Sequence, residues 1–169
     1  VARNEKFRNY FVSLLQERKV KKNYKAIVVG KTIGSFKITN PIGRDKNNRT
    51  KMSIRADGKE AITFVKLEES YQNYSLLDVS IETGRTHQIR VHLNSKKLPI
   101  IRDKVYNSSR HIAKETPLDL IDIIRNFPRQ ALHSYQLSFE DPDTNEILSF
   151  HAPMHKDMEN LINRVKKHI

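Results

Sequence analysis

The densest group of chemically active side chains lies in residues 82–92, which read E-T-G-R-T-H-Q-I-R-V-H. Arginine, histidine, glutamine and threonine side chains crowd together there around a turn at Gly84. A helix that starts behind a glycine turn presents free backbone N–H groups and the positive end of its dipole, which suits a phosphate or a carboxylate. The segment therefore predicts an anion site at the N-terminus of a helix over 86–93, with Thr86 as its cap. A solvated basic helix is the alternative.

Arg90 would lie one turn inside this helix, between two apolar residues. An arginine in that place either extends its head group to solvent or pairs with a buried acid. Further along the chain, Asp103 stands between Arg102 and Lys104, which is typical of a surface ion pair. Tyr106 is expected to serve packing, so the pattern gives neither of these last two side chains a chemical role.

Tyr24 is a second candidate. It lies inside an apolar run, and Lys21, Lys22 and Lys25 are close to it in the sequence. Most tyrosines in such a run are core residues whose hydroxyl has a partner. The other interpretation is a ring that stacks on a base, with its hydroxyl near a reacting centre. The residues alone favour the core interpretation.

The segment from Gly43 to Lys51 combines turn residues with dense positive charge. Four basic side chains stand there against one acid, and nothing in the segment can be buried, so we expect an exposed loop at the tip of a hairpin. A charge run of this kind is usually a solvated face. Arginines and asparagines in a flexible loop also match the way RNA backbones are held, with an affinity that falls as the salt concentration rises.

Several catalytic classes lack their signatures. The chain has no cysteine, which excludes a disulfide scaffold, a thiol nucleophile and a cysteine-based metal site. His87 and His92 are five residues apart, whereas a helix places two metal ligands four apart, and there is no H-E-x-x-H pattern. A G-x-S-x-G elbow and a Walker loop are also missing, which speaks against serine hydrolases and nucleoside triphosphatases.

Composition bounds the remaining possibilities. The 169 residues, 37% hydrophobic and 30% charged, suit one ordinary domain with a real core. The formal net charge of +12 favours a polyanionic partner such as nucleic acid. No apolar run approaches the ~20 residues of a membrane span, so we expect a soluble protein, and a cytoplasmic location fits.

Periodicity predicts one α+β domain with a mixed, mainly antiparallel sheet flanked by helices. Apolar residues at helical spacing predict four helices, over 4–18, 86–93, 117–127 and 156–167. Alternating or short apolar runs predict seven strands, over 23–29, 35–39, 52–54, 61–67, 76–81, 131–139 and 147–150. Asn4 is the expected cap of the first helix.

Taken together, several segments resemble one family, the RluA-type pseudouridine synthases, and within it the RluD-like members that modify large-subunit ribosomal RNA. The matching stretches follow the family's order over essentially the whole chain, and the most specific of them is G-R-T-H-Q-I-R-V-H. The others are K-K-N-Y-K-A-I-V, P-I-G-R-D-K-N-N-R-T-K-M, G-K-E-A-I-T, P-I-x-x-D-x-x-Y, R-Q-A-L-H and F-x-A-P-M-x-x-D-M.

The resemblance implies a partial pseudouridine synthase fold and an isomerase that needs no cofactor and no metal. In it, uridine is flipped out of RNA, detached from its ribose by an aspartate, turned, and rejoined through C5. It implies that Tyr24 packs at the uracil and takes part in proton transfer, and that Arg90 pairs with the catalytic aspartate. The residues expected to contact RNA are Arg44, Arg49, Lys51, Arg85 and His87.

One departure from the family pattern is large. The family's catalytic aspartate belongs to an H-R-L-D motif, which by the family's spacing falls roughly nine residues before Val1. We therefore expect residues 1–169 to be a single catalytic domain that lacks its N-terminal part, monomeric, and inactive as it stands. Arg90 would then be exposed, bound to another acid or anion, or disordered. A smaller departure is Arg102, where the family commonly has glycine.

Two rival hypotheses stay open. The first is a non-catalytic RNA-binding module derived from this fold, which binds RNA without converting uridine. The second is a purely structural basic protein, which has no preference for RNA over other polyanions. The residue string upstream of Val1 separates the enzyme from the RNA-binding module, because only the enzyme needs the aspartate.

Overall fold

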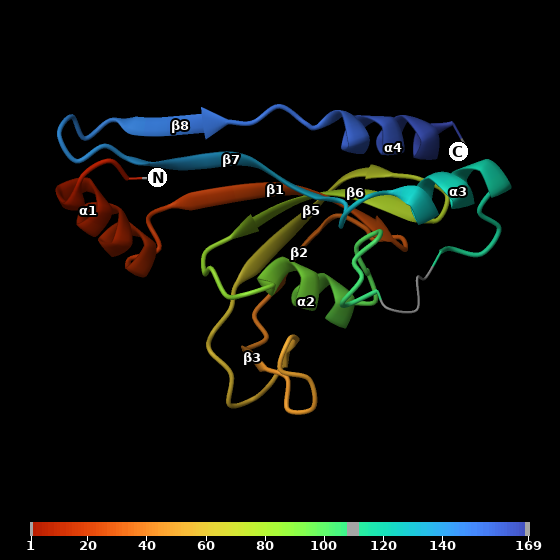
Figure 1. Ribbon diagram of the computed structural model, residues 1–169, viewed down its shortest axis with the longest axis horizontal. Helices are drawn as coiled ribbons and strands as arrows, with labels where there is room; N and C mark the ends of the chain where they lie inside the picture. The colour runs from red at the N-terminus through yellow and green to blue at the C-terminus, as the bar shows by residue number, and fades with distance from the viewer. Residues whose placement is uncertain (1, 108–111, 168–169) are drawn as a thin grey trace.

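A six-stranded antiparallel sheet forms the centre of the protein (Figure 1). The computed structural model describes residues 2–107 and 112–167. The strand order is β2-β5-β6-β1-β7-β8, with β1 in the interior between β6 and β7. The strands are β1 (Lys21–Val29), β2 (Ser35–Ile38), β5 (Thr63–Ser70), β6 (Tyr74–Ile81), β7 (Leu132–Glu140) and β8 (Ile147–His151). The predicted α+β class with a mainly antiparallel sheet is confirmed.

Helices lie on both sides of this sheet. Figure 1 shows α2 (Gln88–Ser95) below the central strands and α4 (Lys156–Lys166) above them, with α3 (Leu118–Asn126) beside α4. The main core takes in apolar side chains from the central strands and from these three helices, among them Leu77, Leu93 and Leu161, all fully buried. Apolar residues spaced three and four apart on each helix supply its inner face. No helix in the described residues is long and apolar enough to cross a membrane.

The first helix, α1 (Glu5–Gln16), begins as predicted. The Asn4 side chain accepts a hydrogen bond from the Phe7 amide at 2.8 Å and so caps the helix. The helix packs through Leu14 on Phe139 of β7, in a small apolar cluster separate from the main core. This cluster anchors α1 at one end of β1 and β7, where Figure 1 places it.

The basic segment sits on a two-stranded hairpin, as expected. Strands β3 (Ile42–Arg44) and β4 (Met52–Ile54) pair with each other, and their apolar side chains pack with Val91 of α2 in a third cluster. The intervening loop is ordered by Asp45, whose carboxylate accepts the amides of the two asparagines that follow it, both at 2.9 Å. The hairpin is therefore attached to α2 rather than to the main sheet.

Gly58 holds the base of this hairpin and cannot carry a side chain without displacing backbone. A Cβ built there would lie 2.6 Å from the Ile42 carbonyl carbon. Gly58→Ala should therefore lower the free energy of unfolding by about 2 kcal/mol, measured by urea titration. The control is Gly34→Ala, whose Cβ meets nothing within 4 Å and which should lose only the ~1 kcal/mol of its left-handed backbone, φ 63°. Equal losses in the two variants would contradict the steric explanation.

Candidate active site

The helix that carries most of the candidate residues starts later than predicted. It begins at Gln88, and the residue before it, His87, adopts a left-handed φ of 57° without a capping side-chain bond. The prediction of Thr86 as the cap is wrong. The Gln88 carboxamide oxygen instead reaches back from the first residue of the helix and accepts the Arg85 amide of the preceding turn at 3.0 Å.

Four buried polar side chains fix α2 against the sheet. Gln88 donates to the Ile62 carbonyl and to the Thr63 hydroxyl, and accepts from Thr83 at 2.7 Å. His92 is fully buried, with Nε2 2.9 Å from the Asn40 carbonyl and Nδ1 2.8 Å from the Thr63 hydroxyl. Since a carbonyl can only accept, Nε2 carries a proton, and burial favours the neutral imidazole by lowering the pKa of His92.

This buried histidine makes stability depend on pH. Burial lowers the pKa of His92, so the folded state resists a proton that the unfolded chain takes up near its ordinary value of 6.5. The stability that neutral His92 contributes is complete above pH 6.5, and it is lost as the pH falls from there through the lower pKa of the folded state. His92→Gln should lose about 2 kcal/mol at pH 7.5 and show a flatter stability profile between pH 7.5 and 5.5, measured by urea unfolding.

His151→Gln is the matched control for this prediction, because that histidine is exposed on the edge strand β8. It should leave both the stability at pH 7.5 and the slope unchanged. If His92→Gln keeps the wild-type slope of stability against pH, groups other than His92 cause the acid sensitivity.

Arg90 forms the central ion pair of the site. Its Nε and Nη2 donate to the two carboxylate oxygens of Asp103, both at 2.7 Å. The Asp103 side chain is 1% exposed and that of Arg90 is 13% exposed. The prediction of a surface ion pair for Asp103 is wrong, whereas the expectation that Arg90 pairs with an acid is confirmed.

Asp103 is held rigidly because its carboxylate also bonds to backbone. Oδ1 accepts the amides of Val105 and Tyr106 at 3.0 and 3.1 Å. Burial raises the pKa of Asp103, but the Arg90 guanidinium and these amides outweigh burial and lower the pKa below 3.8. The preceding residue, Arg102, has a left-handed φ of 58°, the conformation for which glycine is best suited. This turn therefore directs Asp103 inward. The sequence did not predict its burial, because the residues on either side of Asp103 are charged.

Tyr106 does more than pack. Its ring lies under the Arg90 guanidinium, with 4.9 Å between Cζ and the ring centroid. Its hydroxyl is 2.8 Å from His87 Nδ1 and accepts the Met52 amide of the hairpin at 2.8 Å. The structure thus brings two predicted site residues, His87 and Arg90, to one tyrosine for which no such role was predicted.

Tyr24 lies on the same face of the sheet as α2. Thr63, which contacts α2, is two residues from Val65, and Val65 pairs through Val79 with Tyr24. Paired residues and residues two apart share a face. Tyr24 is half-buried beside the main core, and burial raises the pKa of its hydroxyl, partly offset by the Ser134 hydroxyl. Among the described residues, no hydrogen bond or ring contact joins Tyr24 to Arg90.

Lys22, which the sequence places near Tyr24 without a predicted role, also belongs to this face. It precedes Tyr24 by two positions and so shares its face of the sheet, and a Cβ at Gly84 would lie 3.8 Å from its ammonium. Burial lowers the pKa of Lys22. A half-buried cation beside the glycine turn adds to the anion-binding character of this face, and the K-x-Y spacing was the available signal.

The other predicted RNA contacts lie on the hairpin and on the turn before α2. Arg44 and Arg49 are exposed on the hairpin loop, where the Arg44 guanidinium donates to the Arg49 carbonyl, and Lys51 is half-exposed. Arg85 donates from Nε to the Glu60 carbonyl at 2.8 Å. Within residues 2–107 and 112–167, no cluster of three or more histidine, aspartate or glutamate side chains could hold a metal ion.

Comparison with known proteins decides the family. The family profile described as RNA pseudouridylate synthase matches residues 1–95, which is more than half of the chain and includes α2 with Arg90. The chain belongs to the RNA pseudouridylate synthase family.

Curated members of this pseudouridylate synthase family match nearly all of the chain. Ribosomal large subunit pseudouridine synthase D of Vibrio cholerae is 41% identical over 158 residues, which are 94% of the chain and 49% of that protein. The protein of the same name from Neisseria meningitidis serogroup B is 42% identical over 164 residues, 96% of the chain and 43% of its own length. The chain thus spans about half the length of the curated relatives that it matches.

Solved pseudouridylate synthase structures share the fold. Human RNA pseudouridylate synthase domain containing 1 is similar with a TM-score of 0.71 and 21% identity, over 98% of the chain and 74% of the human chain. Domain containing 4 gives a TM-score of 0.75 and 20% identity, over 96% and 69%. The expected pseudouridine synthase fold is therefore confirmed.

Proposed function

We propose that this chain is the catalytic part of an enzyme that converts uridine to pseudouridine in large-subunit ribosomal RNA. The observation that carries the proposal is the buried, bidentate Arg90–Asp103 pair, on the sheet face that also carries Tyr24. Support comes from the family membership and from relatives named for this activity.

Arg90 is equipped to hold a second carboxylate. Asp103 occupies Nε and Nη2, while Nη1 donates no hydrogen bond within the described part of the chain. An arginine carries five N–H donors in a planar fork, so one carboxylate on its Nε edge leaves the Nη1 edge available. We assign that edge to the nucleophilic aspartate.

Asp103 is itself unsuited to attack a sugar. Its carboxylate is 1% exposed and binds one guanidinium and two backbone amides. A nucleophile needs an accessible lone pair, which this arrangement denies. Asp103 is therefore a positioning residue, and we propose that the nucleophile is the aspartate of the family's H-R-L-D motif. Residues 1–169 do not contain this motif, so the activity tests use a longer protein that carries it.

The reaction breaks the N1–C1′ bond of uridine and forms a C5–C1′ bond. The aspartate carboxylate attacks C1′ and forms an ester bond to it, while the uracil departs with the electron pair of the N1–C1′ bond and turns. C5 then attacks C1′, the carboxylate leaves, the proton on C5 is removed, and N1 ends with a proton. Tyr24 would stack on the turning base and help move the C5 proton.

The test is nucleoside analysis of a large-subunit ribosomal RNA transcript incubated with the longer protein. Pseudouridine should appear at the expense of one uridine, and changing the H-R-L-D aspartate to asparagine should abolish it. RNA binding without any pseudouridine would instead support the binding module derived from this fold. Equal binding of heparin and RNA would support a purely structural basic protein.

The hairpin loop should supply much of the salt dependence of RNA binding. We expect Arg44→Ala combined with Arg49→Ala to reduce the slope of log affinity against log salt by about one to two. The slope is measured from the affinity of the 169-residue chain for a stem-loop transcript at salt concentrations from roughly 50 to 300 mM, the range over which phosphate contacts dominate. The control, Lys156→Ala with Arg164→Ala, removes two exposed charges from α4 and should leave the slope unchanged.

We also propose where and in what form the protein works. Residues 1–169 act as one catalytic domain, the protein works as a monomer in the cytoplasm, and its partner is ribosomal RNA. Sedimentation of the longer protein with and without the transcript tests the monomer.

A further inference from the structure

We propose that Tyr106 is a positioning residue with two separable roles. Its ring orients Arg90, and its hydroxyl fixes the position of the basic hairpin relative to Arg90. This inference rests on the proposed function, because it assigns Arg90 to the reaction and the hairpin to RNA. Tyr106 itself lies on the loop after Asp103 and is half-exposed.

The ring restrains the guanidinium from its face while Asp103 restrains it from its edge. Arg90 Cζ is 4.9 Å from the Tyr106 ring centroid, and both Asp103 bonds lie in the plane of the fork. A cation over an aromatic face gains electrostatic energy only while the two stay stacked. The two contacts together leave Arg90 little freedom except at its Nη1 edge.

The hydroxyl connects three different elements. It accepts the Met52 amide from β4, so its own proton is available for Nδ1 of His87, the residue just before α2. Burial lowers the pKa of His87 and so favours the neutral imidazole, in which Nδ1 can accept that proton. The His87 and Tyr106 rings also meet edge to face, with centroids 5.6 Å apart. One phenol hydroxyl thereby sets the distance from hairpin to helix.

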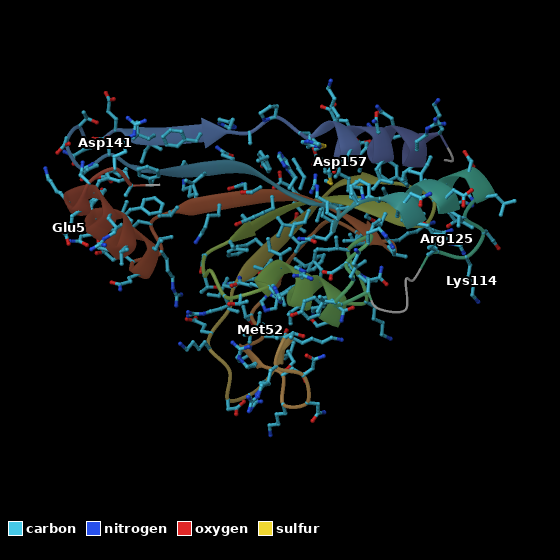
Figure 2. The ribbon with its side chains drawn as sticks, in the orientation of Figure 1. Glu5, Met52, Lys114, Arg125, Asp141 and Asp157 are labelled. Carbon is cyan, nitrogen blue, oxygen red and sulfur yellow. The ribbon has the colours of Figure 1, made fainter. Side chains whose placement is uncertain are left out.

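This connection adds to the anchor at the base of the hairpin, where Ile42 exchanges two backbone hydrogen bonds with Lys59. The hairpin's own pairing covers only three residues on each strand, and it contacts α2 and Tyr106 through one small apolar cluster. Figure 2 shows Met52 just below α2, with the basic loop further from the sheet. Loss of the Tyr106 hydroxyl would release the Met52 amide, so the loop would no longer be held at one distance from Arg90.

Two substitutions separate the two roles. Tyr106→Phe keeps the ring and removes the hydroxyl, and we expect KM for the RNA transcript to rise about fivefold with kcat within about twofold of wild type. Tyr106→Leu removes the ring as well, and kcat should fall about tenfold further because Arg90 loses its stacking partner. The activity assay uses the longer protein and single-uridine conversion.

A second readout does not depend on activity. Hydrogen exchange at the Met52 amide of the 169-residue chain should speed up about fivefold or more in Tyr106→Phe, because its acceptor is gone. Tyr10→Phe is the matched control: it removes a hydroxyl that donates to the Glu140 carbonyl at the far end of the molecule, and it should change neither KM nor Met52 exchange.

Each outcome decides a different point. Unchanged Met52 exchange in Tyr106→Phe overturns the proposed hairpin connection even if the enzyme is active. Faster exchange with an unchanged KM overturns its role in RNA binding, and an unchanged kcat in Tyr106→Leu overturns the orientation of Arg90. An inactive wild-type protein with faster Met52 exchange in Tyr106→Phe would overturn the proposed function and leave the connection standing.

Discussion

Arg90→Ala should lower the rate of uridine conversion by about a thousandfold, because under the proposed function Arg90 supplies preformed charge beside the reacting carboxylate. The expected loss is in kcat, since RNA binding depends on the hairpin and on other basic residues. The loss is measured by single-turnover conversion, with the longer protein in excess at a concentration that saturates the RNA.

Folding must be separated from chemistry in this variant. The substitution leaves the Asp103 carboxylate buried without its cation, so stability should also fall by about 3 kcal/mol. Arg90→Lys keeps the charge but not the bidentate fork, and we expect a loss of about a hundredfold with a smaller loss of stability. Arg125→Ala, an exposed arginine on α3 far from α2 in Figure 2, should retain full activity. Conversion by Arg90→Ala at the wild-type rate would remove Arg90 from the mechanism.

Asp103→Asn should lower conversion by about a hundredfold without any change in the residues that touch RNA. The amide can still accept from a backbone N–H but cannot bind the guanidinium with two charged oxygens, so Arg90 loses its fixed orientation. Stability should fall by about 3 kcal/mol, measured by urea unfolding at pH 7.

The same variant tests the pH dependence that Asp103 confers. Because the folded pKa of Asp103 lies below 3.8, its contribution is complete above that value and is lost as the pH falls through it. Wild type should therefore lose stability more steeply than Asp103→Asn below about pH 4. Asp122→Asn, an exposed acid on α3, should follow the wild-type profile. Parallel profiles for wild type and Asp103→Asn would show that the pair adds no net stability.

Most of the fold could be predicted from periodicity. The strands that became β1, β2, β6, β7 and β8 alternate or run apolar, and each was placed within about three residues of its observed bounds. The Asn4 cap was equally direct, since its partner amide is three residues away. These features depend on contacts between residues that are close in the sequence, so a local pattern is enough to predict them.

The site was predictable only in part, because its contacts join residues far apart in the chain. Arg90 was identified, but its partner Asp103 stands between two basic residues, and only the left-handed turn at Arg102 sends it inward. Tyr106 meets Met52 across 54 positions, a contact that no local pattern encodes. The helix start was misplaced because His87 adopts a left-handed φ just before Gln88, whose side chain bonds to Thr83 and Arg85 of the preceding turn.

The most direct test of the central claim is an experimental structure of the longer protein. We predict that Arg90 Nη1 lies within about 3 Å of the H-R-L-D aspartate while Asp103 keeps both of its bonds to Nε and Nη2. The account is contradicted if Nη1 faces solvent with no carboxylate beside it, or if the upstream aspartate displaces Asp103 from the guanidinium.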